Sequence, residues 1–299
     1  MFKLIWNTAN LSDYKPYVNE PSNIKVIASK WGVYHEKNSK KWIFSLLSNV
    51  NFEVINQIEN IKKEDKLIIV DSSVEKKKEF YSKLNLICSN FFLFHLGDET
   101  GGKESLPIYN LSSQSWRTFC SNIYFSSNKT ECIPLGPKSG IEDINIKRRK
   151  YKWAWTGTIH KSSRHDLLYQ LEKIEPFFIH KTKKFSDNTS LNTEKMSEIL
   201  SNTEFLPCAN GIVHPETYRL YEALECGCIP IVENAFRYFD RLYPNNPFIK
   251  VDKWIEAKDK ILKYNQDEII SKRDECKNWW KNYKIYLQKK ISKKLINAI

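Results

Sequence analysis

Arg219 and Glu222 are the charged residues whose types and spacing could do chemistry in this chain. They lie in TYRLYEALECGCIPIV, residues 217–232, a pattern typical of a helix that ends near Gly227 and passes into a strand. Residues three apart on a helix share a face. Such a pair is common and weak on a surface. In a cleft, however, the carboxylate can accept both hydroxyls of a ribose, and the guanidinium can bind a diphosphate.

A second candidate site for an anion is TGTIHKSSR, residues 156–164. This segment joins an expected strand to an expected helix, so its backbone N–H groups and the helix dipole would face an anion. Gly157 permits close approach of the backbone, and Lys161 and Arg164 add positive charge. The two serines before Arg164 fit helix capping as well as ligand contact.

Two carboxylates, Asp98 and Glu99, follow the apolar run FFLFHL at residues 91–96. Carboxylates at the end of a strand could take a proton from an acceptor hydroxyl as a general base, or could simply form a turn. Of the two, we favour Asp98 as the base. His95 lies inside the apolar run, which predicts a histidine of the core rather than a base.

The sequence lacks the patterns that would indicate a metal site, a P-loop or a disulfide framework. No Asp-x-Asp triplet occurs, so a metal-bound diphosphate is not indicated, and GPKS at residues 136–139 does not complete the P-loop pattern. The seven cysteines have irregular spacing and no C-x-x-C, which predicts neither a disulfide framework nor a zinc ribbon. We therefore expect no metal and no cofactor.

The composition is that of a globular protein, with 41% hydrophobic residues and a net charge of +12. The sequence has no stretch that approaches the roughly 18 apolar residues of a membrane span, and it begins without a signal-peptide pattern, so we expect a cytoplasmic protein. Residues 271–295 alternate lysines with aromatic and aliphatic residues at close to helical spacing, as in a helix with one buried face. We expect no specific nucleic-acid partner, while peripheral membrane association stays open.

Continuous apolar runs separated by helical segments predict parallel strands covered on both faces. In the first half we expect strands at residues 2–6, 24–28, 67–70 and 91–96, a further apolar run at 122–125, and helices at 40–49 and 75–84. In the second half we expect strands at 151–156, 177–180, 203–208 and 228–233, and helices at 164–174, 194–202 and 216–226. The polar segment 142–150 marks a boundary between domains 1–145 and 146–265, followed by a helical segment, 266–299.

The segment from Cys208 to Pro230 resembles the exostosin-like (GT47-like) glycosyltransferases. The resemblance rests on a strand that ends in Cys-Ala-Asn-Gly, then Arg219, then Glu222 with Ala-Leu, and then Gly-Cys-Ile-Pro from Gly227. Looser matches are HLGDE after the strand at 91–96, Pro-Leu-Gly at 134–136, and Trp-Thr-Gly at 155–157. The HLGDE run is also similar to the ribitol-phosphate xylosyltransferase branch near that family.

The resemblance implies the GT-B fold, an α/β arrangement of two Rossmann-like domains with a cleft between them. It also implies that the second domain holds the nucleotide sugar and that the C-terminal helix packs back on the first domain. Glu222 would hold the ribose, and Arg219 would neutralise the departing diphosphate. The expected donor-binding residues are Gly157, Lys161, Arg164, His214, Thr217, Arg219 and Glu222.

One departure from related enzymes bears on stereochemistry. Many retaining GT-B enzymes share a Glu-x7-Glu pattern, but the position eight before Glu222 is His214. Glu225 and Glu233 have that spacing in the wrong register, at the ends of a helix and a strand. We therefore expect an inverting enzyme, in which His214 could touch the diphosphate or the sugar.

Together these patterns predict a metal-independent hexosyl- or pentosyltransferase. It would use a nucleotide sugar, with a UDP-sugar favoured, and a glycan or polymer-precursor acceptor. One alternative is a fucosyltransferase-like GT-B enzyme that uses a GDP-sugar. The other is a non-catalytic protein that binds carbohydrate or nucleic acid.

Overall fold

The structure is a computed structural model of the chain. It describes residues 1–7, 30–55, 61–97, 99, 103–120, 129–184, 187–234 and 237–297. For residues 30–32 it describes the helical backbone only. The chain divides into two compact units. Unit 1 comprises Met1–Pro134 and Leu287–Ile299, and unit 2 comprises Leu135–Tyr286.

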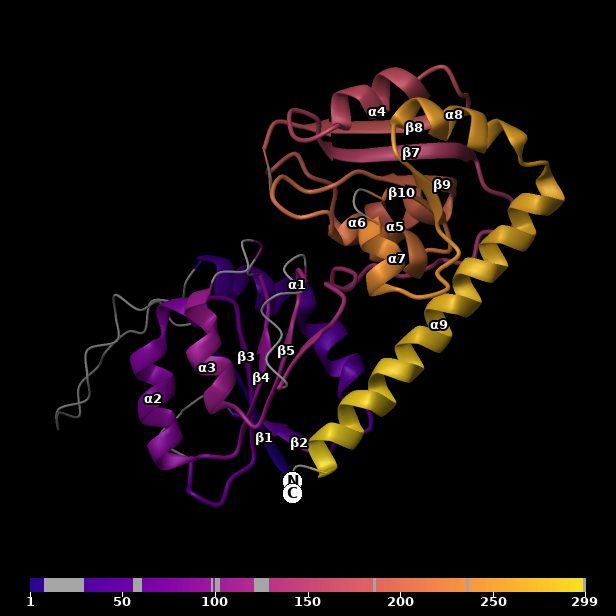
Figure 1. Cartoon of the computed structure of the whole chain (residues 1–299). Helices are drawn as coiled ribbons and strands as arrows, with labels where there is room; N and C mark the ends of the chain where they lie inside the picture. Colours follow the sequence, from indigo (N-terminus) through magenta and orange to yellow (C-terminus); the bar gives the residue numbers. More distant parts are fainter. Residues whose placement is uncertain are drawn as a thin grey trace. The chain divides into compact units, whose positions relative to one another are not determined.

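Unit 1 is built around a parallel sheet (Figure 1). Its described strands are β1 (Phe2–Asn7), β2 (Phe52–Val54), β3 (Leu67–Asp71), β4 (Phe91–His95), β5 (Gln114–Arg117) and β6 (Thr130–Cys132), in the spatial order β2-β1-β3-β4-β5-β6. The helices are α1 (Lys30–Leu46), η3 (Val74–Lys76), α2 (Lys78–Ile87), η4 (Lys103–Ser105) and α3 (Leu106–Leu111). The strand order reverses direction between β1 and β3, which makes that point a topological switch point.

Successive side chains along each strand of unit 1 point to opposite faces of the sheet, and both faces are apolar. On one face, Leu67, Ile69 and Leu93 pack with Phe80 and Tyr109, which come from α2 and α3. On the other face, the ring of Trp116 from β5 stacks with the rings of Phe92 and Phe94 from β4. Figure 1 draws α1 on the side of the sheet opposite α2 and α3. Both faces are therefore covered, which explains the uninterrupted apolar runs of β3 and β4.

Unit 2 repeats this plan with a second parallel sheet. Its described strands are β7 (Tyr151–Thr158), β8 (Phe177–Thr182), β9 (Thr203–Cys208), β10 (Ile229–Glu233) and β11 (Ile249–Val251), in the order β11-β10-β9-β7-β8. The helices are α4 (Arg164–Leu171), α5 (Thr193–Ser201), α6 (Tyr218–Glu225), α7 (Tyr238–Leu242), α8 (Trp254–Lys263) and the first part of α9 (Gln266–Asn297). The switch point of this sheet lies between β7 and β9.

The core of unit 2 places α4 and α8 on one face of the sheet and α5 and α6 on the other (Figure 1). Trp153, Leu167 and Trp254, all fully buried, belong to the cluster under α4 and α8. These two units confirm the predicted α/β class with two Rossmann-like parallel sheets. The expected strand at 24–28 and the apolar run at 122–125 lie outside the described residues.

Most expected elements lie where the sequence predicts them, with shifted ends. α1 begins at Lys30, well before the expected residue 40, and α2 begins at Lys78 because residues 74–76 form the 3-10 turn η3. The short strands β2, β5, β6 and β11, and the helices α3, α7 and α8, were not predicted. Each of these strands has three or four residues, too few to show a period.

The end of α6 follows the sequence prediction closely. Gly227 has φ of +66°, and its N–H donates to Leu224 O, while Cys228 N donates to Ala223 O at 2.8 Å. This is the double hydrogen bond of a Schellman C-cap, and it requires the left-handed conformation that glycine adopts freely. Pro230 is the second residue of β10, near its start as predicted.

One disulfide departs from the sequence analysis, which predicted no disulfide framework. Cys120 and Cys132 are bonded, with their Cα atoms 5.8 Å apart. Cys132 ends β6 opposite Arg117, the last residue of β5, and Cys120 follows three residues later. The pairing thus depends on the parallel register of two strands, which the spacing of cysteines along the chain does not show. The other five cysteines are free and buried.

Arg149 is a buried guanidinium that joins three elements of unit 2. Its Nη1 donates to Leu200 O at 3.1 Å and to Thr203 O at 2.6 Å, and its Nη2 donates to Cys226 O at 2.7 Å. These carbonyls lie at the end of α5, the start of β9 and the C-cap of α6. The positive charge therefore stabilises two helix C-termini at once.

We predict that Arg149→Met destabilises the chain by about 3 kcal/mol, because it removes several charge-assisted hydrogen bonds and leaves buried carbonyls without a donor. Urea unfolding followed by tryptophan fluorescence measures this loss. Arg148→Met is the matched control, since Arg148 is exposed and its loss should change stability by no more than about 0.5 kcal/mol. Equal midpoints for the two variants would contradict the role of Arg149.

Candidate donor-binding site

The switch point of the unit 2 sheet gathers most of the predicted donor-binding residues. In parallel α/β sheets, ligands bind outside the carboxyl ends of the strands at such a point. Here β7 ends at Thr158, β9 ends at Cys208, and the two strands are neighbours. Gly157 lies near the end of β7, Lys161 lies in the loop that follows, and Arg164 is the first residue of α4. The segment after β9 leads to α6.

Arg219 and Glu222 form a buried ion pair rather than a solvated one. Nη1 of Arg219 lies 2.8 Å from Oε2 of Glu222, and the exposed fractions of the two side chains are 17% and 2%. Nη2 of Arg219 donates to Thr156 O at 2.7 Å, and Nη1 lies 3.6 Å from the sulfur of Met196. The guanidinium is thus fixed at the carboxyl end of β7, where the sequence analysis expected a diphosphate.

Arg164 adds a second guanidinium at the same strand ends. Its Nη1 donates to Oγ1 and O of Thr158, at 2.8 and 3.2 Å, and its Nη2 lies 3.5 Å from Asn210 O. It also lies 5.6 Å from the ring centre of Trp155, a cation–π distance. Burial and the charge of Arg219 lower the pKa of Arg164, while Glu233 opposes this shift. Two cations close enough to disfavour each other create a place where an anion is stabilised.

Gly157 keeps this place open. Its φ is +128°, a conformation that L side chains rarely adopt. A Cβ built there would lie 3.9 Å from Nη2 of Arg219, so the glycine faces the guanidinium directly. Any larger residue would strain the backbone and cover the guanidinium.

Lys138 is a third cation of this site and was not predicted. It lies in the GPKS segment that the sequence analysis rejected as a P-loop, and its Nζ lies 5.6 Å from the ring centre of Tyr218. Burial lowers the pKa of Lys138; the charge of Glu222 opposes this and that of Arg219 adds to it. Lys138 is therefore an electrostatic neighbour of the predicted pair. In the sequence, the only indication of this role was a lysine beside glycine and proline, and these residues form no complete motif.

Glu233 is a second carboxylate at this edge, also not predicted as part of the site. It ends β10, and its Oε2 accepts from Ser163 Oγ at 2.6 Å and Asn210 N at 3.2 Å. Ser163 Oγ in turn accepts from Nε1 of Trp254 at 2.9 Å. Ser163 thus serves neither as a side-chain cap of α4 nor as an open ligand contact.

Two atoms at this edge retain hydrogen-bonding capacity. Nε of Arg164 and Oδ1 of Asn210 are buried and have no hydrogen-bond partner in the part of the chain that the structure describes. Buried polar atoms are normally satisfied, so these two indicate a polar ligand or water at the strand ends.

The remaining predicted donor residues differ in their surroundings. His214 is buried at 1% exposure, its Nδ1 accepts from Glu216 N at 3.0 Å, and its ring packs against Tyr238. Its contacts position the loop between β9 and α6. Thr217 is the N-cap of α6 and makes no side-chain capping hydrogen bond, and Lys161 is half-buried in the loop after β7. α6 begins two residues later than predicted, because the backbone of Thr217 is extended (φ −138°, ψ 158°) and the helix can start only after it.

The buried side chain of Glu216 stabilises the loop between β9 and α6. Its Oε1 accepts from Leu135 N at 2.8 Å and from the hydroxyl of Tyr221, and it lies 3.3 Å from the hydroxyl of Tyr243. Its Oε2 accepts from Tyr238 at 3.3 Å. Burial, and next the charge of Glu216, raise the pKa of Tyr221 and of Tyr243 well above the ordinary value, which keeps both hydroxyls protonated as donors.

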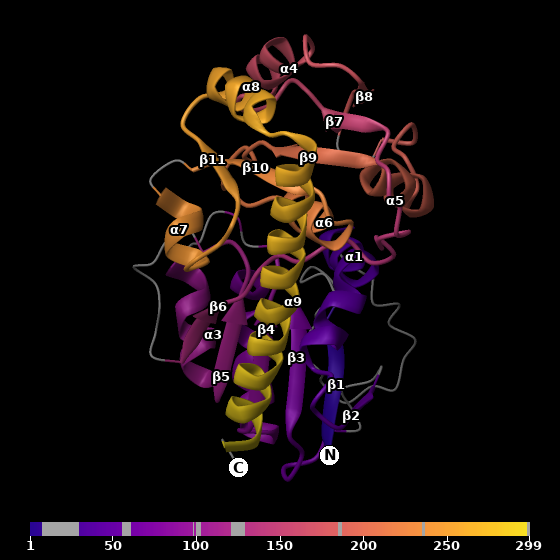
Figure 2. The ribbon, with the colours of Figure 1, turned by 90° about the vertical axis from the view of Figure 1, so that its right-hand side faces the viewer.

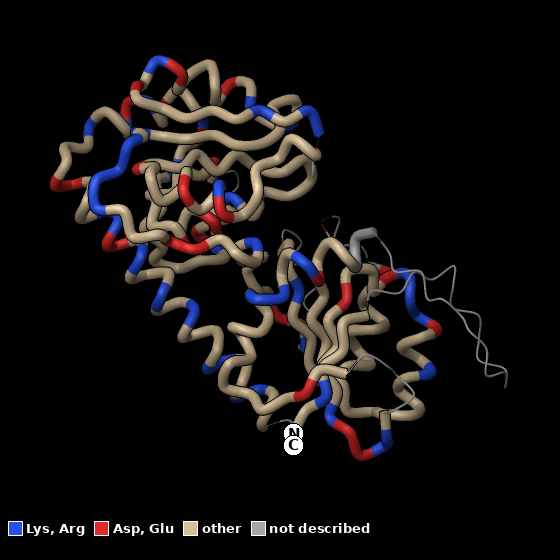
Figure 3. The backbone as a smooth tube through the Cα atoms, turned by 180° about the vertical axis from the view of Figure 1, so that it is seen from behind, with Lys and Arg blue, Asp and Glu red and all other residues tan. Residues whose placement is uncertain are grey.

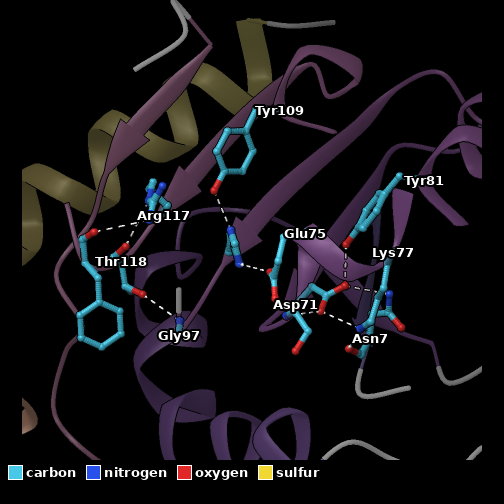
Figure 4. Close-up of polar contacts among 12 residues, drawn as sticks. Asn7, Asp71, Glu75, Lys77, Tyr81, Gly97, Tyr109, Arg117 and Thr118 are labelled. Carbon is cyan, nitrogen blue, oxygen red and sulfur yellow. Dashed lines mark hydrogen bonds and ion pairs between the residues drawn. The ribbon is translucent and has the colours of Figure 1, made fainter. Parts of the chain in front are cut away.

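Unit 1 contains the predicted general bases. Asp98 lies outside the described residues. Glu99 is exposed, four residues after the end of β4 at His95, and its N–H donates to Gly97 O. His95 is fully buried, and its Nδ1 lies 2.6 Å from the hydroxyl of Tyr109, which confirms the core histidine. Its Nε2 lies 3.7 Å from Oε2 of Glu75, a half-buried carboxylate that the sequence analysis did not consider (Figure 4).

A buried polar network occupies the switch point of unit 1. Asp71, at the end of β3, accepts from Lys77 Nζ at 2.7 Å, from Tyr81 at 2.7 Å and from Asn7 Nδ2 at 2.9 Å (Figure 4). Lys77 also donates to Asn7 O. Because every member has partners, the network is a structural support for the ends of β1 and β3 and offers no open carboxylate.

The described ranges contain no group of three or more His, Cys, Asp and Glu side chains that could hold a metal ion. None of their helices combines the length and the apolar character needed to cross a bilayer.

We predict that Glu216→Gln lowers stability by about 2 kcal/mol, because an amide cannot accept from all the donors that surround the carboxylate. A thermal melt should show a decrease of about 4–8 °C in Tm. Glu172→Gln, at an exposed carboxylate at the end of α4, should leave Tm unchanged. A Glu216→Gln melt that overlays the control would show that the tyrosine hydroxyls do not depend on this charge.

Comparison with known proteins identifies the family. Among curated proteins none matches the chain. One similar solved structure is an alpha-glucosyltransferase in complex with UDP-glucose and DNA containing an abasic site, with 9% identity over 93% of each chain. Its TM-score is 0.35, too low to support an argument. The model of the RXYLT1 C-terminal domain family, in contrast, matches residues 137–299, more than half of the chain and nearly all of unit 2. The chain therefore belongs to the RXYLT1 C-terminal domain family, a branch of the exostosin-like glycosyltransferases.

Proposed function

We propose that this glycosyltransferase moves a sugar from a nucleotide-sugar donor to a hydroxyl of a glycan or polymer-precursor acceptor. The observation that carries the proposal is the cationic site at the β7–β9 switch point. There the buried Arg219–Glu222 pair lies with Lys138 and Arg164 around a glycine that leaves the strand end open. Such a site suits the diphosphate of the donor and of the departing nucleotide.

The cationic side chains would stabilise the leaving group without a metal. As the glycosidic bond to the diphosphate breaks, negative charge grows on the phosphate oxygens. Arg219 is held rigidly by Glu222 and Thr156 O, so it needs no rearrangement to meet this charge. We favour UDP as the nucleotide, Glu222 as the partner of the ribose and Thr217 and Lys161 as further donor contacts. A ribose contact would require the carboxylate of Glu222 to keep one oxygen for the nucleotide.

The acceptor hydroxyl would be activated by a carboxylate of unit 1. We keep Asp98 as the favoured base and Glu99 as the second candidate, both following β4. The residue eight before Glu222 is the buried His214, so the Glu-x7-Glu pattern of many retaining GT-B enzymes is missing at Glu222, and this supports inversion. The family name further suggests a pentosyl donor and a polyol-phosphate acceptor.

Two other functions make different predictions. A fucosyltransferase-like enzyme would bind GDP in preference to UDP. A non-catalytic protein that binds carbohydrate or nucleic acid would show no nucleotide effect, and its affinity for nucleic acid would fall steeply with salt. The cationic site favours the nucleotide-sugar enzyme, because a nucleic-acid surface does not need a buried arginine–glutamate pair beneath a glycine.

We predict that one nucleoside diphosphate among UDP, GDP, CDP and ADP raises Tm in the presence of EDTA, because a ligand that binds only the folded state stabilises it. Arg219→Ala should weaken binding of that nucleotide about 100-fold, since it removes a charge-assisted contact with the diphosphate. Glu222→Ala should also remove the shift, because it releases Arg219. Arg148→Ala, at an exposed arginine of the same unit, is the control. No shift with any nucleotide at millimolar concentration would refute the proposed donor class.

We also predict that the affinity for this nucleotide decreases as the solution becomes alkaline. Burial lowers the pKa of Lys138 in the free protein, and a bound diphosphate would favour its charged form. Affinity should therefore be constant below that lowered pKa and fall by at most about tenfold per pH unit above it. Calorimetric titrations over a range of pH measure the slope. Lys138→Arg keeps its charge and should flatten the curve; an unchanged slope in this variant would exclude Lys138 as the titrating group.

A further inference from the structure

We infer that the exposed face of α9 binds an anionic membrane surface. α9 is a single helix from Gln266 to Asn297, drawn in yellow in Figure 2. After Glu275 the chain contains no further acidic residue, although seven lysines follow. Figure 3 shows basic residues recurring along this helix. The inference does not depend on the proposed function.

Four of these lysines are used within the protein. Lys277 pairs with Asp143 at 2.6 Å and Lys284 with Glu225 at 2.7 Å, both in unit 2. Lys290 and Lys294 both pair with Glu131 of unit 1, at 3.2 and 2.7 Å. Their charges are therefore neutralised by the surfaces on which the helix packs.

The other three lysines, Lys281, Lys289 and Lys293, are exposed and interleaved with exposed apolar side chains. The apolar residues are Ile285, Tyr286 and Ile296, whose exposed fractions are 38%, 54% and 53%. At 100° per residue, these six residues fall within an arc of about 140° on the helix. The buried residues Cys276, Trp280, Leu287, Ile291 and Leu295 fall on the opposite arc.

This combination favours a lipid surface over other polyanions. A helix that lies in a membrane interface buries its apolar side chains among the headgroups, while lysines reach the lipid phosphates on flexible stems. Each lysine near an anionic surface contributes about 1 kcal/mol, so three lysines supply weak, reversible binding. Nucleic acid would use the lysines equally well but would gain nothing from two isoleucines on the same face. The apolar residues therefore distinguish the two partners.

The test measures sedimentation of the full-length chain with vesicles of phosphatidylcholine and phosphatidylglycerol in equal parts, at low salt. We expect binding to these vesicles and none to phosphatidylcholine alone. The variant K281Q/K289Q/K293Q should reduce the partition coefficient about 100-fold. K63Q/K83Q/K263Q, which removes the same charge from exposed lysines elsewhere, should reduce it by less than about threefold.

The apolar contribution is tested with I285S/Y286S/I296S, which should reduce the partition coefficient about tenfold. I255S, at an exposed isoleucine of α8, is its control. Tm of every variant is measured, and the exposed positions should leave it unchanged. Three outcomes would overturn the inference: no binding of the wild type, equal losses in the two lysine variants, or full binding by the apolar variant. Equally tight binding of duplex DNA, insensitive to the apolar variant, would identify the face as a general polyanion surface instead.

Discussion

The buried carboxylate of Glu216 is the interaction on which the rest of the candidate site depends. A carboxylate inside a protein is tolerated only when donors surround it, and here three tyrosine hydroxyls and the N–H of Leu135 do so. Through these donors one side chain joins the start of unit 2 to α6 and to the region of α7. The backbone N–H of Glu216 is left to bond His214, which shapes the loop between β9 and α6. Arg219 and Glu222 then project from a helix whose first turn is already placed.

The cationic site follows from the geometry of a parallel sheet. Strand ends at a switch point leave space because the flanking connections go to opposite faces. Unit 2 fills the edges of this space with charge from four separate segments, which carry Lys138, Arg164, Arg219 and Glu233. Three cations and two carboxylates, with Glu222 included, leave an excess of one positive charge before a ligand binds. Arg219 is held by Glu222 and by the carbonyl of Thr156, and Arg164 is held by the hydroxyl and the carbonyl of Thr158.

The equivalent edge of unit 1 has a different character. Asp71, Lys77, Tyr81 and Asn7 satisfy one another completely, and the network stabilises the strand ends. The carboxylates nearer to solvent are Glu75 and Glu99. The same topology thus serves as an internal support in one unit and as a charged, glycine-lined edge in the other. Side-chain chemistry, and not the fold, makes this difference.

Local sequence patterns determined the elements and several details of the site. The apolar runs of β3, β4 and β9 identified parallel strands because both faces of each sheet are covered. Gly227 indicated a left-handed C-cap because no other residue adopts that conformation without cost. The spacing of Arg219 and Glu222 predicted a shared face because one helical turn is 3.6 residues.

Tertiary structure determined the contacts between segments that are distant in the sequence, which no local pattern shows. Arg219 is fixed by the carbonyl oxygen of Thr156, which lies 63 residues earlier in the chain. Lys138 and Glu233 join the site, and His214 becomes internal, only when separate segments meet at the sheet edge. The Cys120–Cys132 disulfide likewise depends on strand register. Contacts between residues far apart in sequence arise from packing of the folded chain. The local pattern of a single sequence therefore does not show which of these residues will meet.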